Sequence, residues 1–185
     1  MNENQRFAKF QVGQWSYGQP YVAEFPNSSS LIVGRFCSIA GGVSIFLGGE
    51  HRTDWVTTYP FNVLFGEAHS VKGHPTSKGD VILGNDVWIG QDVLLLSGVH
   101  IGDGAVIGAR SVVSSNIPPY TIAAGNPCRV IRQRFSDELI EELLKISWWN
   151  WPLPKITQAL PDLLSPDIEA FVRKYSVSRT NRVGL

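Results

Sequence analysis

Aliphatic residues recur every six positions through the middle of the chain. They are Leu83, Ile89, Leu95, Ile101, Ile107 and Val113, and glycine directly follows four of the six. Small or β-branched residues come four positions after them, at Val87, Val93, Val99, Ala105, Ser111 and Ile117. A period of six fits neither a 3.6-residue helix nor an alternating strand. It is typical of a solenoid in which each side is a short strand followed by a corner.

This period predicts triangular coils. Three sides of six residues give 18 residues per coil, so residues 83–118 make two coils. Residues 31–46 carry most of another coil, with Cys37 and Val43 at the small position, and residues 12–25 could supply a first, poorly matched one. We expect the aliphatic side chains inside, with glycines at the corners because they adopt unusual φ angles. A sandwich of unrelated short strands is the alternative, and six consecutive matches disfavour it.

The composition fits a soluble globular protein whose 185 residues are enough for one domain with a sizeable core. Sixteen basic residues offset sixteen acidic ones, so no strong field for nucleic acid or an anionic membrane follows. The segment MNENQRFAKF lacks the apolar core of a secretory signal, and no apolar run approaches the roughly 20 residues that cross a bilayer. We therefore expect a cytoplasmic protein without membrane insertion, with Cys37 and Cys128 as thiols.

Several motifs resemble those of hexapeptide-repeat acyltransferases, namely LGNDVWIG and GDGAVIGARSVVSSNIPPYTIAAGNPCRVIRQRF. The segment GRFCSIAGGVSIFLGGEHRTDWVTTYPF is similar to the xenobiotic branch, which includes chloramphenicol and streptogramin acetyltransferases and related sugar O-acetyltransferases. The resemblance covers most of the chain. It implies an all-β solenoid, a left-handed parallel β-helix, assembled as a homotrimer with sites between subunits. The left hand rests on the resemblance alone, because the general preference for parallel crossovers is right-handed.

We expect three regions along the chain. Residues 1–135 form the β-helix domain with a loop excursion at 47–79, residues 136–175 form a C-terminal helical cap, and residues 176–185 are a tail. Ser136 is a predicted N-cap, the prolines of SWWNWPLP end that helix, and Pro166 lies in the first turn of another. Such a cap would cover the unpaired end of the solenoid.

The excursion carries the chemistry, and its central residue is His51. A histidine takes up a proton near neutral pH, as a base that activates a hydroxyl must. From composition alone a surface histidine without a role is the more ordinary interpretation. The resemblance reverses this, because the branch carries its catalytic base in a pattern that the segment GEHRTDWVTTYPF matches. Glu50 or Asp54 could orient the ring, although a solvated carboxylate is more usual. His69 and His74 match no such motif but could touch a substrate.

Aromatic residues around this segment suggest an acceptor pocket. Trp55 and Tyr59 could wall it, although they could equally pack to fix the loop. Tyr17, in WSYGQPYV, belongs to a segment that sugar O-acetyltransferases share in rough form. Together with Asp54 these are the predicted substrate-binding residues.

The resemblance implies acetyl-CoA as co-substrate, in a groove between neighbouring β-helices. Gln91, Ala109 and Ser114 match family positions that contact CoA. Gln91 and Ala109 differ by 18 and so occupy the same place on successive coils. Arg129 and Arg132 match positions near the nucleotide, and arginine suits phosphate oxygens.

The sequence thus predicts an acetyl-CoA-dependent O-acetyltransferase with no metal. Its acceptor is a sugar or polysaccharide precursor, or a hydroxylated antibiotic, which would confer antibiotic resistance. Transfer to nitrogen stays open. One rival is a non-enzymatic β-solenoid scaffold or binding protein. The other is a zinc hydratase resembling γ-class carbonic anhydrase, which needs three histidine ligands converging across subunits, whereas the four histidines here show no paired spacing.

Overall fold

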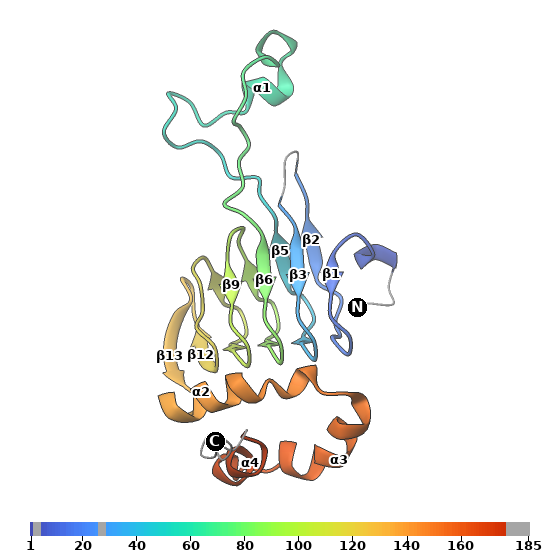
Figure 1. The fold of residues 1–185 in the computed structure, drawn as a ribbon. Coiled ribbons are helices and arrows are strands. Elements are labelled where there is room, and N and C mark those ends of the chain that lie inside the picture. The colour runs from blue at the N-terminus through green and yellow to red at the C-terminus, as the bar shows by residue number, and fades with distance from the viewer. Residues whose placement is uncertain (2–4, 26–28, 177–185) are drawn as a thin grey trace, which may run out of the picture. The chain divides into compact units, whose positions relative to one another are not determined.

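The computed structural model describes residues 1, 5–25 and 29–176 and divides the chain into two compact units, Met1–Arg132 and Gln133–Leu185. The first unit is built of three sheets (Figure 1). Sheet A holds β1 (Gln11–Val12), β3 (Leu31–Val33), β6 (Val81–Leu83) and β9 (His100–Ile101). Sheet B holds β4 (Ser38–Ile39), β7 (Trp88–Ile89), β10 (Val106–Ile107), β12 (Thr121–Ala124) and β13 (Arg129–Gln133). Sheet C holds β2 (Tyr21–Ala23), β5 (Ser44–Phe46), β8 (Leu94–Leu95) and β11 (Val112–Val113).

From β3 to β11 the chain visits the sheets in the order A, B, C, and each of these strands pairs in parallel with its counterpart on the neighbouring coil. Ile89 of β7 pairs with Ile107 of β10, which is the predicted offset of 18 residues. Val33 of β3 pairs with Leu83 of β6, so an insertion separates these two coils in sequence but not in space. The poorly matched first coil is also present, because β1 and β2 join sheets A and C. The prediction of a left-handed parallel β-helix with an inserted loop and C-terminal helices is confirmed.

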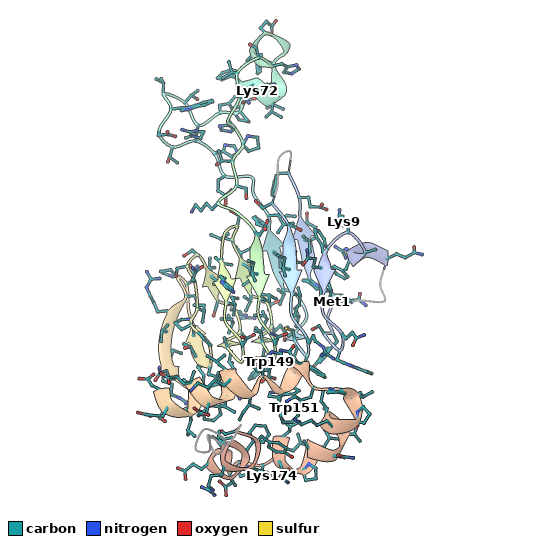
Figure 2. All side chains as sticks on the ribbon, in the orientation of Figure 1. Met1, Lys9, Lys72, Trp149, Trp151 and Lys174 are labelled. Carbon is teal, nitrogen blue, oxygen red and sulfur yellow. The ribbon has the colours of Figure 1, made fainter. Side chains whose placement is uncertain are left out.

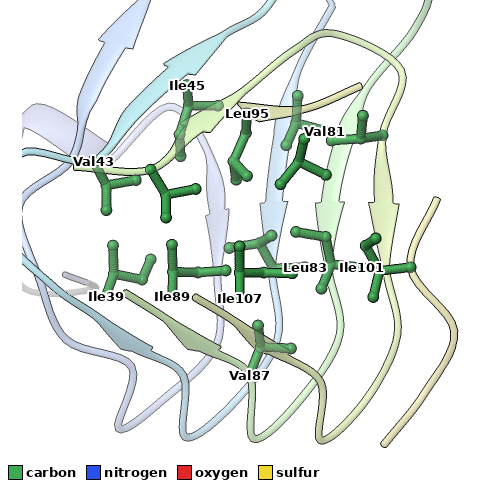
Figure 3. Close-up of a cluster of buried hydrophobic side chains, with 14 of the residues drawn as sticks. Ile39, Val43, Ile45, Val81, Leu83, Val87, Ile89, Leu95, Ile101 and Ile107 are labelled. Atoms are coloured by element: carbon green, nitrogen blue, oxygen red, sulfur yellow. The ribbon is translucent and has the colours of Figure 1, made fainter. Parts of the chain in front are cut away.

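The aliphatic residues that recur every six positions fill the interior of the coils (Figure 3). Leu83, Ile89, Leu95, Ile101, Ile107 and Val113 are all at most 1% exposed. Each of these side chains stacks on the residue at the same position of the neighbouring coil, so every coil buries apolar surface against the next. Cys37 belongs to this core, and burial raises the pKa of its thiol to about 11. The thiol is therefore a packing group and not a nucleophile.

Gly98 and Gly104 have the predicted positive φ angles, 75° and 66°, but the glycines that directly follow the repeated aliphatic residues have a different role. The positive φ angles at these corners belong to residues such as Asp86 (55°) and Asp92 (57°), two positions after Gly84 and Gly90. A Cβ placed on Gly84 would lie 2.7 Å from the backbone nitrogen of Asp103 on the next coil. The repeat requires glycine there because successive corners approach too closely for any side chain.

The second unit consists of α2 (Asp137–Ile146), η3 (Trp148–Asn150), α3 (Leu153–Leu163) and α4 (Ile168–Tyr175). Ser136 caps α2 as predicted, because its hydroxyl accepts a hydrogen bond from the Leu139 amide. Two details differ from the prediction. Ser147, in a left-handed conformation, ends α2 before the prolines, and α3 begins among those prolines. The start of α4 is capped by Asp167 and follows Pro166 instead of including it.

The predicted tail, 176–185, lies outside the described residues except for Ser176. That the helices cap the solenoid stays a prediction. Among the helices of the described part of the chain, none is long and apolar enough to cross a membrane. η1 (Gln5–Phe7) and the two short helices of the excursion, α1 (Phe61–Leu64) and η2 (Gly66–Ala68), complete the list of elements.

Candidate active site

The excursion leaves the coils after β5 of sheet C and returns to β6 of sheet A, at the corner between these sheets (Figure 1). Its two ends are joined by an antiparallel bridge, in which the Glu50 amide donates to the Thr76 carbonyl at 3.1 Å and the Thr76 amide donates back at 2.9 Å. The Ser97 hydroxyl, on the next coil after β8, donates to the Glu50 carboxylate. The residue directly before His51 is therefore anchored to the solenoid.

The His51 ring is exposed, and its tautomer follows from its contact. Nδ1 lies 2.8 Å from the backbone carbonyl oxygen of Thr58. A carbonyl oxygen can only accept a hydrogen bond, so Nδ1 must carry the proton. In the neutral ring Nε2 is then unprotonated, which is the form of a general base. No residue-type pattern marks Thr58 as a partner of His51, because Thr58 contributes a backbone atom.

The two flanking carboxylates have other partners. Arg52 donates to Asp54 from Nε at 2.7 Å and from Nη2 to the second oxygen, and this hydrogen bonding lowers the pKa of Asp54 to about 2. The side chain of Asp54 is 62% exposed. Glu50 is held by Ser97, and the Nδ1 of His51 contacts a backbone carbonyl. Neither Glu50 nor Asp54 therefore orients the His51 ring, as had been suggested for one of them.

A second histidine lies against His51. The ring of His74 is 4% exposed, and its centroid lies 4.8 Å from that of His51 at an interplanar angle of 69°. Its Nδ1 accepts a hydrogen bond from the Arg52 amide at 3.4 Å, and its backbone carbonyl accepts one from the Asn62 side chain at 2.6 Å. Trp55 also packs on His74, with ring centroids 5.8 Å apart. His74 is a site residue that the sequence motif did not identify.

The predicted acceptor residues fall in three places. Trp55 belongs to the His51 cluster, where the Arg52 guanidinium lies 5.2 Å from its ring. Tyr59 belongs to a separate aromatic cluster with Phe61 and Phe65, with centroid distances between 4.8 and 6.3 Å. All three rings are nearly half exposed. Exposed aromatic side chains that cluster in this way are a candidate binding surface. Tyr17 is elsewhere, beside Ser38 at the edge of sheet B, and is 62% exposed.

The excursion also holds a pocket of about 260 Å³. Its lining includes Asn62, His69, Lys72 and His74, and Figure 2 marks Lys72 on the excursion. This volume is at the small end for ligand pockets, so the pocket could take only part of a larger molecule.

The predicted CoA residues occupy two corners of the solenoid. Gln91 and Ala109 follow β7 and β10 of sheet B on successive coils, and the Arg110 amide donates to the Gln91 carbonyl at 2.8 Å. Both side chains are exposed, as a groove requires. Ser114 follows β11 of sheet C, on the corner from which the excursion leaves. Arg129 and Arg132 lie on β13 at the edge of sheet B, and both are exposed.

Among residues 1, 5–25 and 29–176, no group of three or more His, Cys, Asp or Glu side chains is placed to hold a metal ion. The zinc hydratase alternative requires histidines from neighbouring subunits, so this finding within one chain does not decide it. The arrangement around His51 is suited to proton transfer.

The fold and the repeat identify a hexapeptide-repeat transferase. The family model described as "Bacterial transferase hexapeptide (six repeats)" matches residues 80–115. A hexapeptide-repeat acetyltransferase from Vibrio cholerae has the same fold, with a TM-score of 0.54 at 23% identity over 69% of this chain and 64% of that one.

Sequence relatives define the family more narrowly. A chloramphenicol acetyltransferase of Escherichia coli is 37% identical over 95% of this chain and 91% of its own length. A probable macrolide acetyltransferase of Lysinibacillus sphaericus is 50% identical over 79% of this chain and 84% of its own length. A virginiamycin A acetyltransferase of Staphylococcus aureus is also 50% identical, over 78% of this chain and 67% of its own length. The chain belongs to this xenobiotic acetyltransferase family of hexapeptide-repeat proteins and is an acetyltransferase.

Proposed function

We propose that this acetyltransferase moves an acetyl group from acetyl-CoA to a hydroxyl of a small acceptor, with His51 as the general base. The observation that carries the proposal is the contact between His51 Nδ1 and the Thr58 carbonyl, 2.8 Å long. It leaves Nε2 as the basic nitrogen on an exposed ring, beside a loop rich in exposed aromatic side chains.

The reaction is one direct transfer. The acceptor oxygen attacks the thioester carbonyl carbon while His51 Nε2 takes the hydroxyl proton. Backbone N–H groups stabilise the oxyanion of the tetrahedral intermediate. The carbon–sulfur bond then breaks, and protonated His51 gives its proton to the departing CoA sulfur. The products are the acetyl ester and CoA, and His51 returns to its starting form.

The donor groove involves Gln91, Ala109 and Ser114, with Arg129 and Arg132 near the phosphates. A single chain places the first two on the corner after sheet B and Ser114 on the corner after sheet C. A groove between two chains would bring the corner of one subunit to the corner of its neighbour, which favours a homotrimer with three shared sites. The exposed aromatic side chains of the excursion also favour a subunit contact.

The acceptor is a hydroxylated antibiotic, because relatives with 37–50% identity are acetyltransferases of chloramphenicol, virginiamycin A and, in one case, by its description, macrolides. A sugar precursor is the alternative acceptor. Asp54, Trp55 and Tyr59 of the excursion, and Tyr17 from sheet B, are the proposed acceptor contacts. The enzyme would act in the cytoplasm, with no metal, and its two free cysteines are in keeping with a reducing compartment.

The test is a release assay for free CoA thiol with acetyl-CoA and a panel of acceptors: chloramphenicol, virginiamycin A, a macrolide and nucleotide sugars. We expect acceptor-dependent thiol release with one of the antibiotics and an acetyl ester by mass spectrometry. If only a nucleotide sugar supported turnover, a sugar would replace the antibiotic as the proposed acceptor. If calorimetry showed that CoA binds but no acceptor of the panel supported turnover, the proposal that the protein acetylates these acceptors would be refuted.

A further inference from the structure

We propose that His74 is a positioning residue for the reaction, one that holds the ring of His51 and the backbone beside it. This inference rests on the proposed role of His51 as the base. Neither the family model nor the sequence pattern around His51 includes His74, which follows 23 positions later at the other end of the excursion.

The geometry supports two separate contacts. The His74 ring packs edge-on against the His51 ring, with centroids 4.8 Å apart at an angle of 69°. Its Nδ1 accepts the amide hydrogen of Arg52 at 3.4 Å, which is longer than the usual range of about 2.7–3.2 Å and makes this a weak hydrogen bond. One contact limits rotation of the His51 ring, and the other fixes the peptide that joins His51 to Arg52.

His74 is itself held firmly. It is 4% exposed, its carbonyl accepts from Asn62 at 2.6 Å, and Trp55 covers its ring. The exposed His51 can therefore lie against a buried, fixed support. This is the arrangement that an exposed base needs, because its own ring is secured by only one recorded hydrogen bond, to Thr58.

Packing alone does not account for a histidine at this position. Nε2 of His74 is buried and has no hydrogen-bond partner among the described residues. A buried, unpartnered N–H costs free energy that a phenyl ring would avoid. What imidazole adds over phenyl is the Nδ1 acceptor for the Arg52 amide, so the residue type is explained by that hydrogen bond.

Three variants separate the two contacts. His74→Phe keeps a ring against His51 but loses the acceptor. His74→Asn places an amide oxygen close to where Nδ1 lies but loses the ring. His74→Ala loses both. His100→Ala is the matched control, because His100 is an exposed histidine on β9, outside the excursion.

Two measurements test the proposal. In the first, the protein is labelled with ¹⁵N in its four histidines, and long-range ¹H–¹⁵N spectra report the tautomer of each ring without any substrate. The His51 signals are assigned by their loss in His51→Asn. We expect wild-type His51 as the Nδ1–H tautomer, and in His74→Ala a shift towards a mixture of both tautomers. The control should leave the His51 signals unchanged.

In the second measurement, kcat for acetyl transfer should fall about 10- to 100-fold in His74→Ala, because misplacing a catalytic group by about 1 Å costs up to 10²-fold. The KM for acetyl-CoA should stay within about twofold, since positioning the base does not alter donor binding. His74→Phe and His74→Asn should each lose less than His74→Ala, and these two carry the test if the alanine variant does not fold.

Wild-type kcat in folded His74→Ala would overturn the proposal. So would a fall in kcat with unchanged His51 signals, because that result would assign His74 to packing alone. If the wild-type protein acetylates none of the acceptors offered, the proposed acceptor class has failed, and the substrate-free spectra still decide the role of His74.

Discussion

Replacing His51 by asparagine should remove nearly all turnover while leaving the structure intact. The ring is exposed, and its one recorded hydrogen bond is to the Thr58 carbonyl at 2.8 Å. The side-chain amide of asparagine can donate to the same oxygen, but it has no basic nitrogen where Nε2 lies. The variant therefore separates the loss of the base from the loss of the loop contact.

Removal of a general base typically costs 10²–10⁴ in rate. At about 1.36 kcal/mol per tenfold, this corresponds to roughly 3–5 kcal/mol of transition-state stabilisation. His51→Ala also loses the hydrogen bond to Thr58, which contributes about 0.5–1.5 kcal/mol to the local order of the loop. We therefore expect kcat to fall by about 10²–10⁴ in His51→Asn and by the same amount or slightly more in His51→Ala.

The assay is steady-state release of CoA thiol at saturating acetyl-CoA and acceptor, with CoA affinity measured by calorimetry. CoA affinity should match the wild type in both variants. The melting temperature should match it in His51→Asn and fall at most slightly in His51→Ala, which loses the hydrogen bond to Thr58. His100→Ala should retain wild-type kcat. A His51→Asn enzyme that keeps more than a tenth of wild-type kcat would refute the assignment of His51 as the base.

Three further predictions concern the scaffold and the loop. Gly84→Ala should destabilise the protein by about 1–3 kcal/mol in urea unfolding, because its Cβ meets the next coil, whereas Gly41→Ala, with open space around it, should not. Cys37 should resist alkylation at pH 8 in the native protein and react in denaturant, because burial raises its pKa to about 11 and keeps the thiol protonated; rapid native labelling would contradict this. Arg52 lowers the pKa of Asp54 to about 2, so the stabilisation from this pair is complete above pH 3.8 and is lost as the pH falls towards 2. Asp54→Asn should leave the melting temperature at pH 7 unchanged, because the ion pair is exposed. A large decrease in the melting temperature would show that the loop supports the fold.

The interior of the solenoid was predictable residue by residue. Each aliphatic at the six-residue spacing, such as Ile89 or Ile107, is buried as expected, because a strict period can be satisfied only if equivalent residues stack. The weakly matched first coil was also predicted correctly, because β1 needs only a few correctly spaced residues to pair with β3.

One prediction failed because its cause was an interaction distant in sequence, and another because a local signal was misinterpreted. Gly84 was expected to provide a special φ angle, but its constraint is the backbone of Asp103 on the next coil. Helix α3 was missed because its prolines were taken as the end of the preceding helix, although proline is tolerated in the first turn.

The sequence by itself determined the coils, through a local period that repeats too often to be accidental, and a motif around His51 led to the proposal of that residue as the base. Only the tertiary structure decided how that base is held. The Thr58 carbonyl fixes the tautomer of His51, Ser97 anchors the preceding carboxylate, and the ring of His74 lies against the ring of His51. The physical reason is that one partner is a backbone oxygen and the other two come from separate coils or the far end of a loop, so neither residue type nor spacing records the contact.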